Sequence, residues 1–441
     1  MKPLLPSAIA IISLASISLV AIHQSQTAIE PSRILLTWNG DPATTAAITW
    51  RTDKPSAQTI QFAVASADPR FPKDAQTLTS TEQQVALTAG GTAYYHTATL
   101  KSLKPNTKYS YRVGEGNTWS EWFDFKTASN EPKPFTFIYF GDAQNDVKSM
   151  WSRVIRQAQK DAPYADFMLH AGDLINVPDA DNEWRDWFYA GGWLHSTIPS
   201  VATPGNHEYK SGKITPLWNP QFNYPHNGVA GLEDSNYYID YQGTRIISLN
   251  TMEKQEEQAQ WLDKTLAKTK ANWTILTFHY PMYSTAKGRD NKALRDIWLP
   301  IILKHKVNLV LQGHDHSYGR MNLAHDTKVS TEAHSHDEFT EILPDDEFPI
   351  NSLNASQPGE PIWDTPTNLT TGMVARADST YFVVSVSGPK MYNLGEDAQT
   401  RMTKTGEYKQ LYQVIDVTPK KISYKAFLAT GVLYDSFEIN K

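Results

Sequence analysis

Residues 135–144 read FTFIYFGDAQ, a mostly apolar run that ends at Gly141 and Asp142. A short apolar run bounded by a turn signal is typical of a buried β-strand, so Asp142 is expected just beyond the carboxyl end of a strand. The same arrangement recurs four more times. The expected strands, each with the polar cluster behind it, are 166–169 with GDLIN at 172–176, 200–202 with GNHE at 205–208, 273–278 with HYP at 279–281, and 307–311 with GHDH at 313–316.

Segments with helical spacing of apolar residues separate these runs, at 147–161, 255–270 and 294–305. Strands that alternate with helices predict a layered α/β domain, which we assign to residues 132–441. Further strands are expected at 244–249, 381–387, 412–416 and 421–427. Residues 322–373 lack clear periodicity and are predicted to form a long insertion. Three tryptophans near helical spacing, at 184, 187 and 193, are expected in the core.

The preceding part of the chain has a different pattern of apolar and polar residues. Short alternating runs separated by Gly, Pro, Asn and Asp predict one antiparallel β-sandwich over residues 29–128, followed by a polar linker at 129–134. Residues 103–113 (LKPNTKYSYRV) resemble the tyrosine-corner strand of fibronectin type III domains. The expected strands are 34–38, 47–50, 59–64, 94–100, 108–113 and 119–125.

The composition excludes several classes of protein. The 441 residues include 41 Lys and Arg against 47 Asp and Glu, a net charge of −6, so no long basic surface for nucleic acid is expected. Hydrophobic residues make up 40%, which excludes a wholly disordered chain. The chain has no Cys, so disulfides and thiolate metal sites are excluded. Any metal must be held by nitrogen and oxygen ligands.

The first 28 residues predict export. Met1 and Lys2 precede an apolar, uncharged stretch from about 4 to 22, and the chain then turns polar. This pattern is typical of a secretory signal peptide. An uncleaved N-terminal anchor is the alternative, because the stretch approaches the roughly 20 residues that span a bilayer. Either reading predicts a secreted, periplasmic or extracellular protein without a stable membrane span beyond that possible anchor.

The five polar clusters predict a metal site. In an open α/β sheet, the carboxyl ends of neighbouring strands converge on one crevice, which would gather two Asp, one Asn and four His. Imidazole and carboxylate ligands suit Fe, Mn and Zn. A central Asp can bridge two ions about 3.5–4 Å apart and thereby generate a hydroxide nucleophile near neutral pH. The chemistry to which this set points is phosphoester hydrolysis.

The five clusters match, in order, those of the calcineurin-like metallophosphoesterases, and with the fibronectin-like domain the chain resembles the purple acid phosphatases of that superfamily. The resemblance implies an N-terminal all-β fibronectin III-like sandwich followed by a four-layer α/β/β/α domain. It also implies two divalent or mixed-valence metal ions. By this resemblance, Asp142 and His316 hold the first ion, Asp173 bridges, Asn206, His279 and His314 hold the second, and His207 is the catalytic residue beside the phosphate.

The chain departs from the family pattern at three places. Asn176 stands where purple acid phosphatases have a tyrosinate ligand, and Gln144 stands where other relatives have a histidine. Either amide oxygen could complete the first metal site, and we rank Gln144 first. The loop at 282–290 also lacks the imidazoles of the purple enzymes. We expect Lys287 or Arg289 to supply positive charge for the phosphate there.

Three functions remain open on the sequence. The first is an exported phosphomonoesterase that acts on a small phosphate ester by metal-activated hydroxide attack. The second is a phosphodiesterase on the same site, which the missing imidazoles mildly favour because a diester carries less charge than a monoester. The third is a surface binding protein that acts through the fibronectin-like domain.

Overall fold

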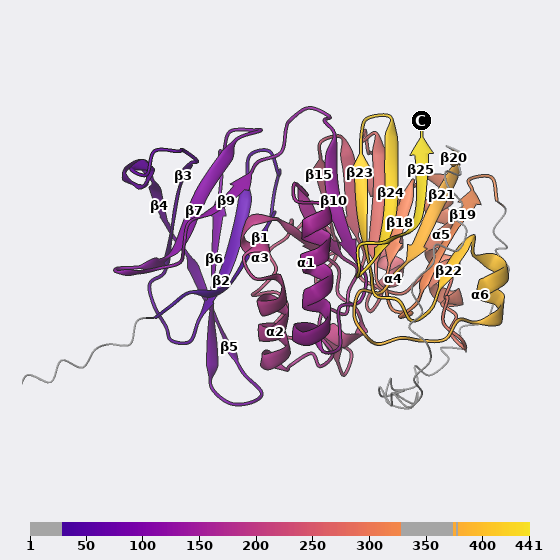
Figure 1. Ribbon diagram of the computed structural model, residues 1–441, viewed down its shortest axis with the longest axis horizontal. Coiled ribbons are helices and arrows are strands. Elements are labelled where there is room, and N and C mark those ends of the chain that lie inside the picture. The colour runs from indigo at the N-terminus through magenta and orange to yellow at the C-terminus, as the bar shows by residue number, and fades with distance from the viewer. Residues whose placement is uncertain (1–28, 328–373, 376–377) are drawn as a thin grey trace, which may run out of the picture.

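The structure is a computed structural model that describes residues 29–327, 374–375 and 378–441. Two domains lie side by side (Figure 1). The first is a sandwich of two antiparallel sheets, with strand orders β1-β2-β6-β5 and β4-β3-β7-β8, and β9 also pairs with β7. Its elements are β1 (Ser32–Thr37), β2 (Ala46–Thr52), β3 (Thr59–Val64), η1 (Phe71–Asp74), β4 (Gln76–Thr79), β5 (Thr81–Ala86), β6 (Thr92–Leu100), β7 (Lys108–Glu115), β8 (Thr118–Trp119) and β9 (Phe123–Lys126).

A tyrosine corner closes this sandwich, as the sequence predicted. The hydroxyl of Tyr109 accepts a hydrogen bond from the backbone N–H of Lys104 at 2.8 Å. The prediction of one strand at 119–125 is wrong, because the structure has two short strands there, β8 and β9. The hydroxyl of Ser120 accepts the backbone N–H of Val113, so a side chain makes the bond that a continuous strand would make with its backbone.

The second domain contains two seven-stranded sheets. Their orders are β12-β11-β10-β23-β24-β25-β20 and β15-β16-β17-β18-β21-β19-β22. The first comprises β10 (Phe135–Phe140), β11 (Phe167–His170), β12 (Ser200–Ala202), β20 (Val374–Ala375), β23 (Leu411–Val417), β24 (Lys421–Leu428) and β25 (Leu433–Asn440). The second comprises β15 (Tyr237–Tyr241), β16 (Thr244–Ser248), β17 (Trp273–Phe278), β18 (Leu309–Gln312), β19 (Tyr318–Ala324), β21 (Ser379–Val384) and β22 (Lys404–Gly406). A separate hairpin pairs β13 (Tyr209–Lys210) with β14 (Lys213–Ile214).

Helices flank the pair of sheets. They are η2 (Val147–Trp151), α1 (Ser152–Asp161), α2 (Asp181–Gly191), α3 (Leu194–Thr197), η3 (Asn206–Glu208), α4 (Gln255–Ala267), α5 (Lys292–Lys304) and α6 (Glu396–Arg401). Side chains alternate along the parallel strand β17: Ile275 packs in the cluster that also contains the core of β10 and α1, whereas Leu276 packs against α4 and α5. Both faces of this sheet are therefore covered, as parallel sheets require, and the layers run α/β/β/α.

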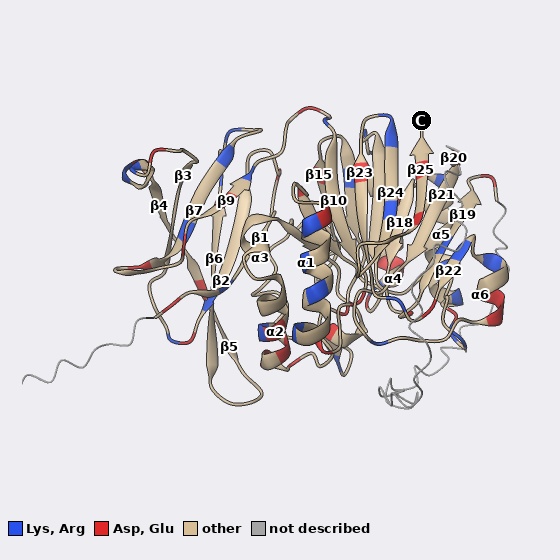
Figure 2. Cartoon of the chain, in the orientation of Figure 1, with Lys and Arg blue, Asp and Glu red and all other residues tan. Residues whose placement is uncertain are grey.

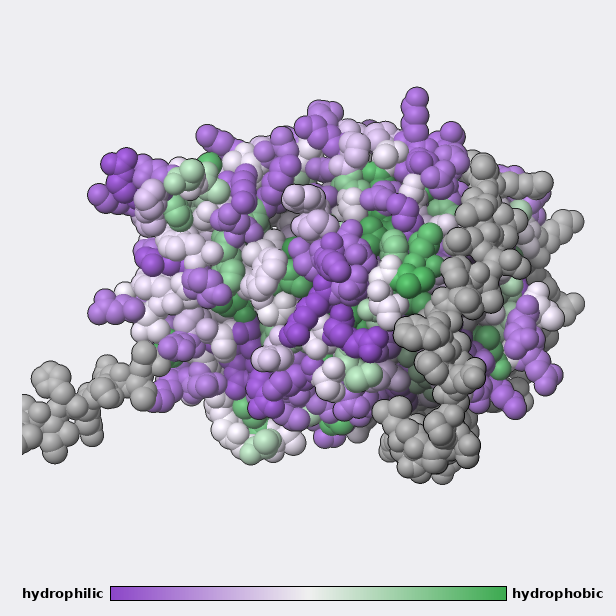
Figure 3. Space-filling model, in the orientation of Figure 1, coloured by the Kyte–Doolittle hydropathy of each residue, from purple (hydrophilic) through white to green (hydrophobic). Residues whose placement is uncertain are grey.

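Helix α1 shows why the outer layers form. Val154, Ile155 and Ala158 are buried on one face. The opposite face carries charged side chains (Figure 2) and is mostly hydrophilic where the space-filling view shows it (Figure 3). An apolar stripe of this spacing drives a helix onto a sheet and leaves its other face in water.

The sandwich docks onto the α2 and α3 end of the second domain. Asp181 accepts hydrogen bonds from Arg33 of β1 at 2.7 Å and from Arg51 of β2 at 2.6 Å. The hydroxyl of Tyr111 donates to the backbone carbonyl of Ser196 at 2.7 Å in a buried position. The two domains are therefore joined by buried polar contacts as well as by apolar packing.

Two sequence expectations need correction. Trp184 and Trp187 are fully buried, but Trp193 is 57% exposed. The helical register that would have buried Trp193 ends at Gly191, because Gly192 has a φ of 53°. The insertion expected from 322 begins later, since β19 continues to Ala324. Most of that insertion, and the predicted signal or anchor at 1–28, lie outside the described residues. Within the described part of the chain, no helix is long and apolar enough to cross a membrane.

Candidate metal centre

The predicted ligands follow the parallel strands of both sheets. Asp142 follows β10 and Asp173 follows β11 in one sheet, while His279 follows β17 and His314 follows β18 in the other. The two sheets meet at this edge, because Asp142 forms a parallel bridge with Val386 beyond β21. The structure thus brings together side chains from strands that lie far apart in the chain.

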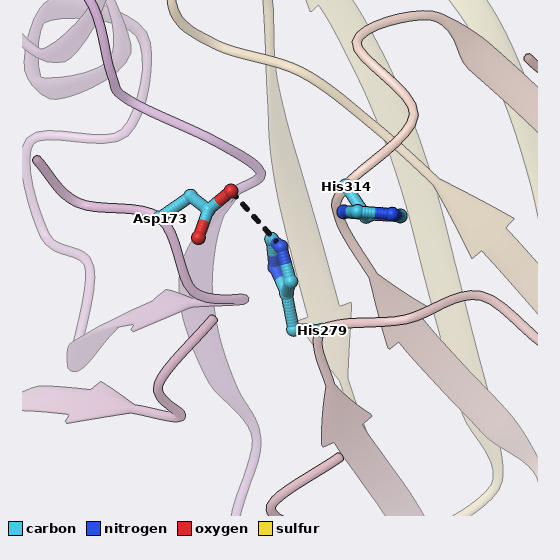
Figure 4. A group of neighbouring side chains, drawn as sticks. All are labelled: Asp173, His279 and His314. Atoms are coloured by element: carbon cyan, nitrogen blue, oxygen red, sulfur yellow. Dashed lines mark ion pairs between the residues drawn. The ribbon is translucent and has the colours of Figure 1, made fainter. Parts of the chain in front are cut away.

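The ligand atoms form two groups that share one residue. One group is Asp173, His279 and His314, and the other is Asp142, Asp173 and His316; in each, one ligand atom per residue lies within 4.8 Å of the others. Figure 4 shows the first group, with the Nε2 atom of His279 3.0 Å from the Oδ2 atom of Asp173. Because Asp173 belongs to both groups, it is placed where a bridging carboxylate would lie.

Backbone carbonyls fix the orientation of two of the imidazoles. The Nδ1 atom of His279 donates to the carbonyl of Ala171 at 2.8 Å, and the Nδ1 atom of His316 donates to that of Lys390 at 2.9 Å. Each ring therefore turns its Nε2 atom toward the carboxylates, as metal-binding histidines commonly do. The Oδ1 atom of Asn206 lies 3.1 Å from the Nε2 atom of His279, beside the first group.

Two glycines make room for the carboxylates. A Cβ atom at Gly205 would lie 2.2 Å from the Oδ1 atom of Asp173, and one at Gly313 would lie 2.3 Å from the Oδ1 atom of Asp142. Real Cβ atoms do not approach other atoms so closely, so any larger residue would displace a ligand or its loop. This explains why a glycine stands in the polar clusters at these positions.

The charges of the site suit cations. Asp142 and Asp173 are buried, and within the described part of the chain their ion pairs are with histidines alone. Burial opposes ionisation of Asp173, but the imidazoles of His279 and His207 outweigh it and lower its pKa. The Oδ2 atom of Asp142 accepts no hydrogen bond from the described residues. Buried carboxylates with imidazole neighbours are a donor set that fits Fe, Mn or Zn.

Gln144 lies among these ligands. Its Nε2 atom is 3.1 Å from the Oδ2 atom of Asp173 and 3.0 Å from the Nε2 atom of His316, and the side chain is fully buried. A half-turn of the amide would place its oxygen at the same position. By contrast, the backbone of Asn176 hydrogen-bonds to Glu183 and His207. The ranking of Gln144 ahead of Asn176 as a metal ligand stays a prediction.

His207 is held by the same loops. Its backbone N–H donates to the Oδ1 atom of Asp173 at 2.9 Å, and its Nδ1 atom donates to the carbonyl of Asn176 at 2.6 Å. The next residue, Glu208, is a supporting residue that our sequence reasoning missed. It is buried and accepts the backbone N–H groups of Asp173, Leu174 and Gly205. Burial, and next the charge of Asp173, raise the pKa of Glu208.

The two predicted cationic residues have different positions. Lys287 is exposed on the loop after β17. Arg289 lies closer to the centre, because its Nη1 atom donates to the backbone carbonyl of His314 at 2.9 Å. The structure therefore places Arg289 beside the ligand loop. Among the described residues, it shows no contact between the Lys287 side chain and the predicted ligands.

Comparison with known protein families agrees with this architecture. Residues 31–127 match the family model described as purple acid phosphatase, N-terminal domain, and residues 135–318 match the model described as calcineurin-like phosphoesterase. The chain therefore carries a purple acid phosphatase N-terminal domain and a calcineurin-like phosphoesterase domain. The two matched regions correspond to the sandwich and to the strands that carry all the predicted ligands, with the last of them, His316, just inside the second match.

Curated proteins similar to this chain include the Fe(3+)-Zn(2+) purple acid phosphatase 12 of Arabidopsis thaliana, 26% identical over 66% of this chain and 65% of the relative. The purple acid phosphatase of Glycine max is 27% identical over 52% and 53%. Human acid phosphatase type 7 is 28% identical over 66% and 70%. The matches to the first two relatives thus span between about half and two thirds of their length.

Solved structures show the same fold. The purple acid phosphatase PPD1 from yellow lupin seeds superimposes with a TM-score of 0.71 at 17% identity, and the alignment covers 93% of this chain and 74% of that one. The structure of PhoD superimposes with a TM-score of 0.60 at 12% identity and covers 94% and 91%. At these identities the likeness establishes the fold alone.

Proposed function

We propose that the chain is an exported, dinuclear metal-dependent phosphohydrolase that cleaves phosphomonoesters. The observation that carries the proposal is the position of Asp173 in both ligand groups. A shared carboxylate between two sets of buried ligands is what a two-ion centre needs. The relatives named as acid phosphatases support the choice of monoesters. Export rests on residues 1–28 alone.

In this proposal the ligands divide between two ions. Asp142, Gln144 and His316 would hold the first, Asn206, His279 and His314 the second, and Asp173 both. Two bound ions would act as Lewis acids that lower the pKa of the attacking water and neutralise charge on the phosphoryl oxygens. The chain supplies the orientation of these ligands through the carbonyls of Ala171 and Lys390.

His207 would act on the leaving group. Its Nδ1 atom is bound by the carbonyl of Asn176, which fixes the plane of the ring. When both nitrogens are protonated, Nε2–H can donate to a phosphoryl oxygen or to the departing alkoxide, because a positioned imidazolium is an effective general acid near neutral pH. Lys287 would add positive charge for the phosphate at the edge of the metal centre.

The test is hydrolysis of a chromogenic phosphomonoester and of the matching diester by metal-stripped protein reloaded with Mn, Zn or Fe. We expect metal-dependent monoesterase activity that Asp173→Ala abolishes and that Asp74→Ala, at an exposed position of the sandwich, leaves unchanged. We also expect no purple colour with iron, since Asn176 replaces the tyrosinate. If the metal-loaded chain hydrolyses neither ester, the proposal is refuted, and the alternative of a surface binding protein that acts through the sandwich is favoured.

A phosphodiesterase is the second candidate, and one observation favours it. Arg289, the guanidinium nearest to the centre among the predicted substrate contacts, is already bonded to the carbonyl of His314. One N–H donor of Arg289 is therefore already used and cannot serve a monoester dianion at the same time. A catalytic efficiency that is higher for the diester than for the monoester would support this candidate over the first.

A further inference from the structure

A buried acid lies between the two metal-binding histidines of the GHDH motif. The Oδ2 atom of Asp315 accepts hydrogen bonds from the hydroxyl of Ser284 at 2.7 Å and from the backbone N–H of Thr285 at 2.5 Å. The side chain is fully buried. The loop that carries His314 and His316 is thereby tied to the loop that follows His279.

Arg289 compensates the charge of this acid. Its Nη1 atom lies 3.8 Å from the Oδ1 atom of Asp315 and, as described above, donates to the carbonyl of His314. The Arg289 side chain is only 17% exposed. A buried carboxylate is costly without a nearby cation, so the guanidinium satisfies a structural need of the ligand loop.

Tyr392 completes the arrangement from a third segment. Its ring centroid lies 4.7 Å from that of His316, and the guanidinium of Arg289 lies 4.7 Å from the centroid of the same ring. The backbone N–H of Tyr392 donates to the carbonyl of His316 at 3.2 Å. This segment also supplies the Lys390 carbonyl that orients the His316 ring.

We propose that Arg289, Asp315 and Tyr392 are positioning residues that hold His314 and His316 in place for metal, so that they set the affinity of the centre for its ions. The inference rests on the proposed two-ion function. It differs from the expectation that Arg289 binds the phosphate, because the contacts of Arg289 are to the ligand loop itself. Residues that orient metal ligands commonly change metal affinity by about 10–100-fold when they are replaced.

The experiment compares Arg289→Ala and Tyr392→Leu with the parent chain. Zn²⁺ binding is titrated to obtain the dissociation constants, and kcat and KM are measured on a phosphomonoester with metal in excess. We expect each variant to bind Zn²⁺ about 10–100-fold more weakly. Because both act on one loop, the double variant should lose less than the product of the two effects. Tyr392→Phe, which keeps the ring contacts, should stay within about threefold of the parent.

Matched controls separate this effect from a general loss of stability. Lys292→Ala removes an exposed cation three residues beyond Arg289, and Tyr164→Leu removes a tyrosine that is 91% exposed. Neither should change the Zn²⁺ dissociation constants. Thermal unfolding without metal should show that the variants remain folded at the temperature of the titration.

The outcomes distinguish this proposal from the function on which it rests. Unchanged Zn²⁺ affinity in Arg289→Ala together with a raised KM would overturn the positioning role and show that Arg289 binds substrate. Weakened affinity in the variants, with parental KM once the metal is saturating, would support the positioning role. A parent chain that binds no Zn²⁺, Mn²⁺ or iron would refute the proposed function, and the positioning role would fall with it.

Discussion

Two buried histidines predict a strong loss of stability in acid. His170 and His195 are almost completely buried beside Trp187, whose ring centroid lies 5.6 Å from that of His170 and 4.0 Å from that of His195. Burial lowers the pKa of His170 to about 3 and that of His195 to about 4, from an ordinary 6.5. Between about pH 4 and pH 6.5, each ring is therefore mostly neutral in the folded chain and mostly protonated in the unfolded chain.

The sign and the size follow from the two pKa values. A histidine whose pKa is lower in the folded state contributes its full stability above pH 6.5 and loses it as the pH falls toward the folded value, since the unfolded chain then binds more protons. For pKa values of 6.5 and 4, the loss between pH 7 and pH 5 is about 2 kcal/mol, and for His170 it is about the same. Together the pair would remove about 4 kcal/mol, a large share of a typical folding free energy.

The assay is urea unfolding at pH 5, 6 and 7 for the parent and for His195→Gln. Glutamine cannot titrate, and its amide can still donate to the carbonyl of Trp187, which the Nε2 atom of His195 contacts at 3.3 Å. The substitution will change stability through packing at every pH. The quantity to compare is therefore the change in the free energy of unfolding with pH. We expect the variant to lose about 2 kcal/mol less than the parent between pH 7 and pH 5. Equal slopes would refute the reasoning, because the metal ligands contribute equally to both chains.

Three further substitutions test the contacts that support the site and the docked sandwich. Tyr109→Phe removes the hydroxyl of the tyrosine corner and should lower the free energy of unfolding by about 1 kcal/mol; an unchanged urea midpoint would contradict this. Asp181→Ala leaves Arg33 without its carboxylate and Arg51 with only the exposed Asp53, and should cost about 2–3 kcal/mol by the same assay, unlike a change at the exposed Asp74. Glu208→Gln places an amide NH₂ against backbone N–H donors and should lower the free energy of unfolding by about 1–3 kcal/mol. We also expect the variant to bind less metal, and a metal content equal to that of the parent would contradict this.

The sequence predicts the strands that are buried on both sides. The bounds of β10, β12 and β17 match the predicted ranges, because continuous apolar runs leave few alternatives to a central strand. Helix α2 was not predicted as an element, although Trp184 and Trp187 on it were expected in the core. The end of α2 depends on the conformation of Gly192, which no periodicity reveals.

The convergence of the predicted ligands could be expected for a similar reason. Each lies within four residues of the end of a strand, so the position of the strand limits the position of the side chain. The residues that orient the ligands were not predictable. The carbonyl of Lys390 and the ring of Tyr392 come from a segment more than 70 residues beyond His316, and a backbone carbonyl has no signature in the sequence.

In the proposed metal centre, Arg289 would support the ligand loop without occupying a metal site. Burial, and next the charge of Arg289, lower the pKa of His314 well below its ordinary range, so that this ring is neutral near pH 7. Neutral imidazole is the form that binds metal. A guanidinium placed between Asp142 and Asp173 would instead compete with the ions for the carboxylates. At the carbonyl of His314 the same charge supports the ligand loop and disfavours protonation of the ligand, and the carboxylates remain available to metal.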